Sequence, residues 1–158
     1  MYVVEILERC GDLAARTGRV YRSLAERSHG DQERARLWRE LALEEETHAD
    51  VLRRELRAFQ EQEQSGTFLP EFAERLQKLD SELVQLEHRA ATAQTFDDAL
   101  AVAVALEQAD LEDLYDDLVL QGEPAFKLLA ERIEGALGSS PQPSSAAGLG
   151  RPPRRERS

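Results

Sequence analysis

The stretch LALEEETHA, residues 41–49, sets two ionisable side chains within an apolar helical pattern. Apolar residues recur three or four positions apart along this part of the chain, and Glu45 and His48 fall on the same stripe. The predicted stripe contains Leu37, Leu41, Glu45, His48, Leu52, Leu56 and Phe59. Burying a carboxylate or an imidazole is costly unless it is paired or bound to a metal ion, so the pattern predicts a polar site inside a helical core.

The composition favours an all-α fold. The chain has 158 residues, the size of one domain, with 41% hydrophobic and 32% charged residues. Leu, Ala, Glu and Arg dominate, and these residues are strong helix formers. Aromatic residues make up only 6%, and runs of β-branched residues are almost absent. The chain has enough apolar material for one helical core.

Five segments show helical spacing of their apolar residues: 2–28, 31–60, 70–92, 95–120 and 124–137. Asp31 is expected to start the second helix, and Thr95 with Asp98 resembles a capping box at the start of the fourth. A weak internal repeat favours two helical hairpins. We therefore predict a four-helix bundle of two hairpins joined by the 70–92 helix as a long crossover.

The C-terminal stretch differs from the rest of the chain. Residues 139–158 are rich in Pro, Ser, Gly and Arg, and this composition predicts a disordered basic tail after a bundle domain at 1–138. The net charge is −11; from Gly138 onward four Arg and one Glu give +3, which leaves −14 for the body. An acidic body disfavours nucleic acid and anionic membranes as partners.

Cysteine usage and hydropathy indicate a cytoplasmic protein. Cys10 is the only cysteine, which excludes a disulfide within the chain and a four-cysteine metal site. It falls on the apolar stripe of the first helix, where a small core residue is the ordinary interpretation. That predicted stripe consists of Val3, Ile6, Leu7, Cys10, Leu13, Ala14, Thr17, Val20, Tyr21 and Leu24. The N-terminus lacks the pattern of a signal peptide, and no apolar run reaches the length of a membrane span. His29 and His88 are expected at the surface.

A second ionisable residue, Glu107, shares an apolar stripe in the fourth helix. The predicted stripe is Phe96, Leu100, Ala103, Glu107, Leu111, Leu114 and Leu118. Glu-x-x-His spacing puts Glu45 and His48 on one helical face, so that both can reach one ion. One His and two carboxylates from two helices suit Fe(II), Mn(II) or Zn(II).

These segments resemble the rubrerythrin-type ferritin-like proteins. Residues 41–49 are similar to the second-helix motif of that family, Tyr21-Arg22-Ser23-Leu24-Ala25 to the end of its first helix, and Thr95–Leu100 with Leu106-Glu107 to its third bundle helix. The resemblance implies a ferritin-like fold and iron ligands at Glu45, His48 and Glu107. The other three family ligand positions fall on Ala14, Ile133 and Ala136, which cannot bind a metal ion.

Two functions follow as alternatives. In the first, a rubrerythrin-like protein binds iron or a similar divalent ion through the reduced site, with a link to iron handling or oxidative stress. Oxidoreductase activity is then implied by the resemblance alone, and a homodimer could complete the site. In the second, a metal-free helical interaction or scaffold module keeps the bundle without the di-iron chemistry. His48 would then exchange a hydrogen bond with Glu107, and Glu44 and Glu46 would be solvated.

Overall fold

The computed structural model describes residues 1–28, 30–62, 65–66, 68–109 and 114. These residues form four helices: α1 (Val3–Glu26), α2 (Gln32–Glu61), α3 (Glu71–Thr92) and α4 (Phe96–Gln108). The described part contains no strand beyond one isolated bridge between Tyr2 and Phe68. The predicted all-α class is therefore confirmed for these residues.

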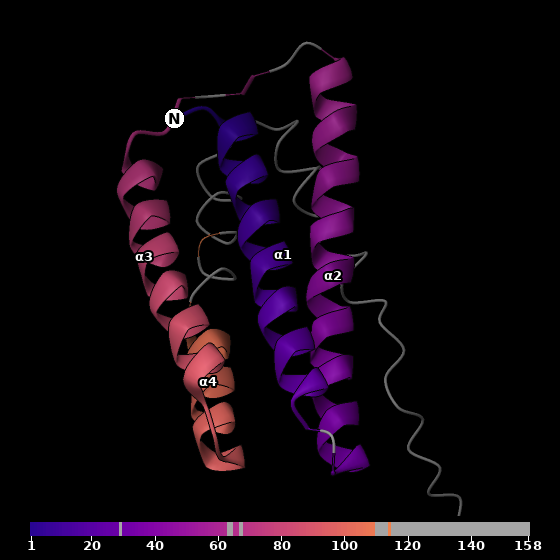
Figure 1. Cartoon of the computed structure of the whole chain (residues 1–158). Coiled ribbons are helices and arrows are strands. Elements are labelled where there is room, and N and C mark those ends of the chain that lie inside the picture. Colours follow the sequence, from indigo (N-terminus) through magenta and orange to yellow (C-terminus); the bar gives the residue numbers. More distant parts are fainter. Residues whose placement is uncertain (29, 63–64, 67, 110–113, 115–158) are drawn as a thin grey trace, which may run out of the picture.

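The helices lie side by side, with α1 between α2 and α3 in Figure 1 and α4 against α3. The start of α1 meets the connection between α2 and α3, because the Val4 amide donates to the Ser65 carbonyl and the Leu69 amide to the Met1 carbonyl. The α1–α2 and α3–α4 turns share the opposite end. α1 and α3 therefore run in one direction, and α2 and α4 in the other.

Helix starts follow the predicted caps closely. The Asp31 carboxylate accepts a hydrogen bond from the Arg34 amide at 3.1 Å, and the Thr95 hydroxyl accepts one from the Asp98 amide at 3.1 Å. Each cap satisfies an amide that has no partner inside its helix. Gly66 has a φ of +76°, and a Cβ there would lie 2.6 Å from the Val3 Cβ. Only glycine suits this position, which lies in the connection between α2 and α3.

The core forms around α1, whose predicted stripe is buried along its whole length. The stripe consists of Val3, Ile6, Leu7, Cys10, Leu13, Ala14, Thr17, Val20, Tyr21 and Leu24. From α3, Phe72, Leu76, Leu83 and Leu86 are buried in the same core, and the partly buried Leu79 packs against it. The burial of one continuous face is the main source of stability for helices of this length.

α1 approaches α2 closely at two glycines. A Cβ on Gly18 would lie 3.3 Å from Cγ of Glu46 and 3.5 Å from the Ala42 carbonyl oxygen, and one on Gly11 would lie 3.7 Å from the Leu52 Cβ. The missing side chains let the two helices come together along this seam.

The inward face of α2 differs from the predicted stripe in its first half. The inward positions are Trp38, Ala42, Glu45, Ala49, Leu52, Leu56 and Phe59, of which all except Glu45 are buried. Leu37 is 39% exposed and Leu41 is half-buried. The prediction was wrong here, because the buried residues follow the predicted leucine positions by one residue. The close contact between α1 and α2 at Gly18 leaves room for a small residue such as Ala42, and not for a leucine.

α4 covers the first part of the predicted fourth helix, of whose residues 110–120 only Leu114 is described, and its inward face differs from the predicted stripe. It ends at Gln108, where Ala109 takes an extended backbone although the sequence has no glycine or proline there. The buried residues are Ala99, Val102, Ala103 and Leu106, whereas Leu100 is 41% exposed. Of the predicted stripe, Leu100 and Glu107 are therefore exposed, whereas Ala103 is buried.

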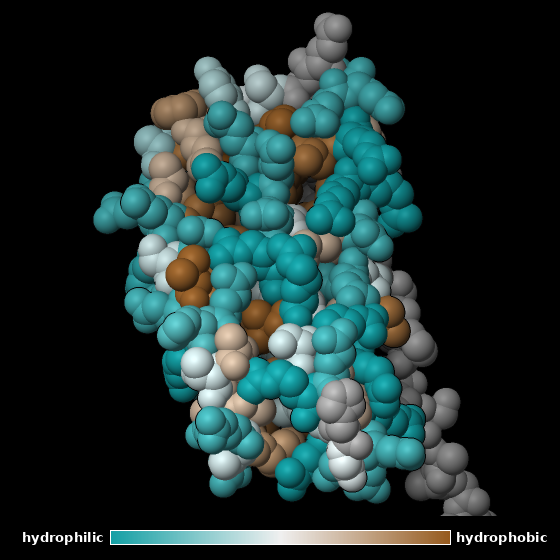
Figure 2. Space-filling view, viewed as in Figure 1, coloured by the Kyte–Doolittle hydropathy of each residue, from teal (hydrophilic) through white to brown (hydrophobic). Residues whose placement is uncertain are grey.

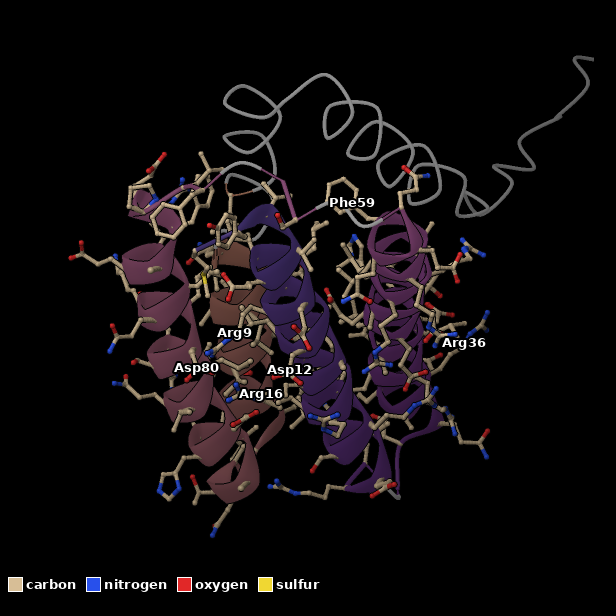
Figure 3. All side chains as sticks on the ribbon, turned by 90° about the horizontal axis from the view of Figure 1, so that it is seen from above. Arg9, Asp12, Arg16, Arg36, Phe59 and Asp80 are labelled. Atoms are coloured by element: carbon tan, nitrogen blue, oxygen red, sulfur yellow. The ribbon has the colours of Figure 1, made fainter. Side chains whose placement is uncertain are left out.

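α3 is a packed member of the described bundle. Arg16 of α1 donates from Nε and Nη2 to both oxygens of Glu87, at 2.9 and 3.1 Å, and from Nη1 to Asp80. Figure 3 shows Arg16 beside Asp80 between the two helices.

The face of the molecule shown in Figure 2 is mostly hydrophilic, with apolar atoms between charged side chains. The predicted helix at 124–137, the rest of the fourth helix and the tail at 139–158 lie outside the described residues.

Candidate polar cluster around Tyr21

Tyr21 links three helices at the candidate site. Its side chain on α1 is fully buried and stacks on Trp38 of α2, with ring centroids 6.3 Å apart and an interplanar angle of 11°. Its hydroxyl donates a hydrogen bond to Oε1 of Glu107 on α4 at 2.8 Å. This bond joins residues 86 positions apart in the chain and gives the buried phenol its polar partner.

Glu45 and His48 lie next to each other on α2. Oε2 of Glu45 is 3.7 Å from Nδ1 of His48, a distance longer than a hydrogen bond. The Glu45 side chain is 19% exposed and that of His48 is 27% exposed. Glu45 occupies an inward position between Ala42 and Ala49, and His48 flanks that face. The two side chains are adjacent, as the Glu-x-x-His spacing predicts.

The pKa of Tyr21 is raised by its burial and by nearby carboxylates. Burial raises the pKa of the Tyr21 phenol far above its ordinary value, and the hydrogen bond to Glu107 raises it further. The negative charges of Glu107, Glu45 and Glu44 act in the same direction. Glu45 and Glu107 therefore bring negative charge to the same hydroxyl. We call Tyr21, Glu45, His48 and Glu107 the polar cluster.

Glu46 has a different role from the solvated one predicted. Nε and Nη2 of Arg22 donate to its two oxygens, each at 2.7 Å. The hydrogen bond from Arg22 lowers the pKa of Glu46, and the pair joins α1 to α2 beside Gly18. Glu44 is exposed, as predicted.

The proposed ligands are only partly brought together. Glu45 and His48 are adjacent, whereas Glu107 is largely exposed and accepts a hydrogen bond from Tyr21. Within residues 1–28, 30–62, 65–66, 68–109 and 114, no three His, Cys, Asp or Glu side chains form a group able to hold one metal ion. Metal binding by Glu45, His48 and Glu107 therefore stays a prediction, and Ile133 and Ala136 lie outside the described residues.

The sequence interpretation missed the partner of Glu107. Tyr21 lies on the predicted stripe of the first helix, and a buried tyrosine needs a hydrogen-bond acceptor, which was the available signal. Cys10 is fully buried in the core, as expected. His88 is exposed, as expected, and His29 lies outside the described residues.

Comparisons with known proteins give no relative for this chain. No protein-family model, no curated protein and no solved structure matches it. In the described part, none of the helices combines the length and apolar character that crossing a membrane requires. The fold and the site thus define an all-α protein with a polar cluster between three of its helices.

Proposed function

We propose that this chain is a helical interaction module of ferritin-like architecture, in which the polar cluster is a structural network. The observation that carries the proposal is the 2.8 Å hydrogen bond from the Tyr21 hydroxyl to Glu107. A protein donor thereby occupies an oxygen of the carboxylate that the resemblance assigns to a metal ion. Because a buried hydroxyl needs a hydrogen-bond partner, Glu107 satisfies the Tyr21 hydroxyl, and the two side chains can face each other without an ion.

The ferritin-like arrangement is part of the proposal. Leu100 and Val104 of α4 are exposed, and so is Leu37 of α2. Leu114, the last described residue, is fully buried in the core, so the chain still contacts the bundle where residues 115–137 begin. A helix at 124–137 would be about 21 Å long and could cover the apolar edge of α4. Slow amide hydrogen exchange in 124–137 would support this, and fast exchange would contradict it.

Divalent metal binding is the second candidate. It is favoured by the adjacency of Glu45 and His48, and by the negative charge that Glu45 and Glu107 bring to Tyr21. Glu45, His48 and Glu107 would be the ligands for iron, manganese or zinc, with water completing the coordination. The ion would replace the hydroxyl of Tyr21 as the partner of Glu107.

Elemental analysis of the purified full chain separates the two candidates. The interaction module predicts metal well below one ion per chain, and no gain in thermal stability when Fe(II), Mn(II) or Zn(II) is added without oxygen. A bound ion would stabilise the folded chain by about 2.7 kcal/mol at one hundred times its dissociation constant. A gain of that size that disappears in His48→Ala but persists in His88→Ala would overturn the proposal. One ion per two chains, with a dimer in solution, would indicate a shared site.

A further inference from the structure

The second feature of interest is a pocket at the end of the bundle where the α1–α2 and α3–α4 turns meet. It has a volume of about 550 Å³. Its wall includes Arg27, Asp31, Arg34, Trp38, Thr95 and Phe96. Ligand pockets in proteins measure roughly 300–1,000 Å³, so this one has the size for a small organic molecule. No residue of the polar cluster lines this pocket, although Trp38, on which Tyr21 stacks, does.

Arg34 presents its guanidinium in a fixed orientation. Its Nε lies 3.0 Å from Oδ2 of Asp31, and its Cζ lies 4.2 Å from the centre of the Phe96 ring. Among the described residues, the two Nη groups of Arg34 have no further hydrogen-bond or ion-pair partner. The side chain is thus held by an aspartate and an aromatic ring, with the forked end available for an anion.

Arg27 has a different task at the same pocket. Its Nη1 and Nη2 groups donate to the carbonyl oxygens of Ala90 and Ala93, at the end of α3. The Ala90 carbonyl also accepts the Ala93 amide at 3.3 Å, so the bonds from Arg27 reinforce the end of α3. Arg27 therefore adds positive charge to the wall and fixes the α3–α4 turn, while Arg34 is the group that can bind an anion. Asp31 offsets one of the two charges.

The apolar part of the wall is aromatic. Phe96 is half-buried and offers the accessible ring, 5.9 Å from the ring of Trp38, while Trp38, Leu24 and Ala99 lie buried behind it. A flat ring can pack on this surface and beside the Arg34 guanidinium, which already stacks on Phe96. The wall thus combines positive charge with a flat apolar surface, in a chain whose net charge is −11.

We infer that this pocket binds a planar organic acid, a flat apolar ring that carries one oxyanion. The Nη groups of Arg34 hold the oxyanion, and the ring packs against Phe96. The inference does not depend on the proposed role of the polar cluster. It would give the interaction module a small-molecule ligand.

Trp38 supplies the readout, because it is the only tryptophan of the chain and lines the pocket. Benzoate, phenyl phosphate and the neutral benzamide would each be titrated into the full chain while Trp38 fluorescence is followed. We expect a saturable change with benzoate or phenyl phosphate, and an at least tenfold weaker one with benzamide, since charge-assisted hydrogen bonds are the stronger ones. The tighter of the two anions identifies the oxyanion as carboxylate or phosphate.

Variants of two arginines complete the test. Arg34→Gln should weaken anion binding about tenfold. Arg34→Lys should weaken it less, because the charge is kept and the fork is lost. Arg36→Gln is the matched control, since Arg36 lies on the same helix, points away from the bundle in Figure 3 and pairs with Glu40 at 2.9 Å. Circular dichroism would verify that each variant is folded.

Three results would overturn the inference: no saturation with either anion, equal affinity for benzamide, or equal effects of Arg34→Gln and Arg36→Gln. The loss of binding with added salt should be larger in the wild type than in Arg34→Gln, because the charge of Arg34 contributes to it. A failed metal test would leave these results unaffected, so the two proposals can be separated.

Discussion

Replacing Glu45 with leucine should stabilise the folded chain. Glu45 lies between Ala42 and Ala49 on the inward face of α2, and its side chain is 19% exposed. Full burial of a leucine side chain contributes about 1.5–3 kcal/mol, and roughly four-fifths of that is available here. The lost contact with His48, at 3.7 Å, is worth about 0.3–0.5 kcal/mol. Glu and Leu have similar helix propensities.

The net expectation is a gain of about 1–2 kcal/mol in the free energy of unfolding. Urea unfolding followed by circular dichroism would measure it as a higher midpoint at an unchanged slope. Glu44→Leu is the matched control, because Glu44 is exposed, and it should change stability by less than about 0.5 kcal/mol. Glu45→Gln removes the charge at nearly the same volume. A loss above about 1 kcal/mol in Glu45→Leu would refute the reasoning, since Glu45 would then make an interaction that exceeds its burial cost.

Three further predictions concern α1. Gly11→Ala should raise the free energy of unfolding by about 0.5–1 kcal/mol, because the added Cβ meets the Leu52 Cβ at an ordinary 3.7 Å. Gly18→Ala should raise it less, because the added Cβ meets the Glu46 Cγ at 3.3 Å. The reverse order would contradict the closer approach of α1 and α2 at Gly18. Arg16→Met should lose about 1 kcal/mol at low ionic strength and less in concentrated salt, and a loss that salt leaves unchanged would contradict an ionic origin. Because its pKa is raised in the folded chain, Tyr21 makes a contribution to the free energy of unfolding that is constant below about pH 10, the ordinary tyrosine pKa, and falls above it. Urea midpoints from pH 8 to 11 should fall less in Tyr21→Phe, and equal slopes would argue against the buried phenol.

The first helix could be predicted almost completely from the sequence. Its large apolar residues lie on one side only, and every residue of that stripe is buried. The inward face of α2 was harder to predict, because the large apolar residues Leu37 and Leu41 defined the predicted stripe while the buried positions hold Ala42 and Ala49. Which face turns inward depends on Gly18 of α1, and helical spacing within α2 carries no information about that contact.

The candidate site was predicted in part for the same reason. The pairing of Glu45 with His48 is local to one helix turn, so the spacing alone predicts their adjacency. The partner of Glu107 is 86 positions away, and the hydrogen bond to Tyr21 depends on how α4 packs. Glu107 is exposed on α4, one residue before the helix ends at Gln108 and next to the buried Leu106. The iron-binding function and the cytoplasmic location stay predictions.

A double-mutant cycle between Tyr21 and Glu107 tests the structural role of the polar cluster most directly. Tyr21→Phe removes the donor and Glu107→Ala the acceptor, and urea unfolding of the four proteins gives the coupling free energy. A hydrogen bond to a charged and partly exposed acceptor predicts coupling of about 1–2 kcal/mol in metal-free buffer. Additive effects, with coupling below about 0.3 kcal/mol, would mean that Tyr21 and Glu107 are not partners and would contradict the account.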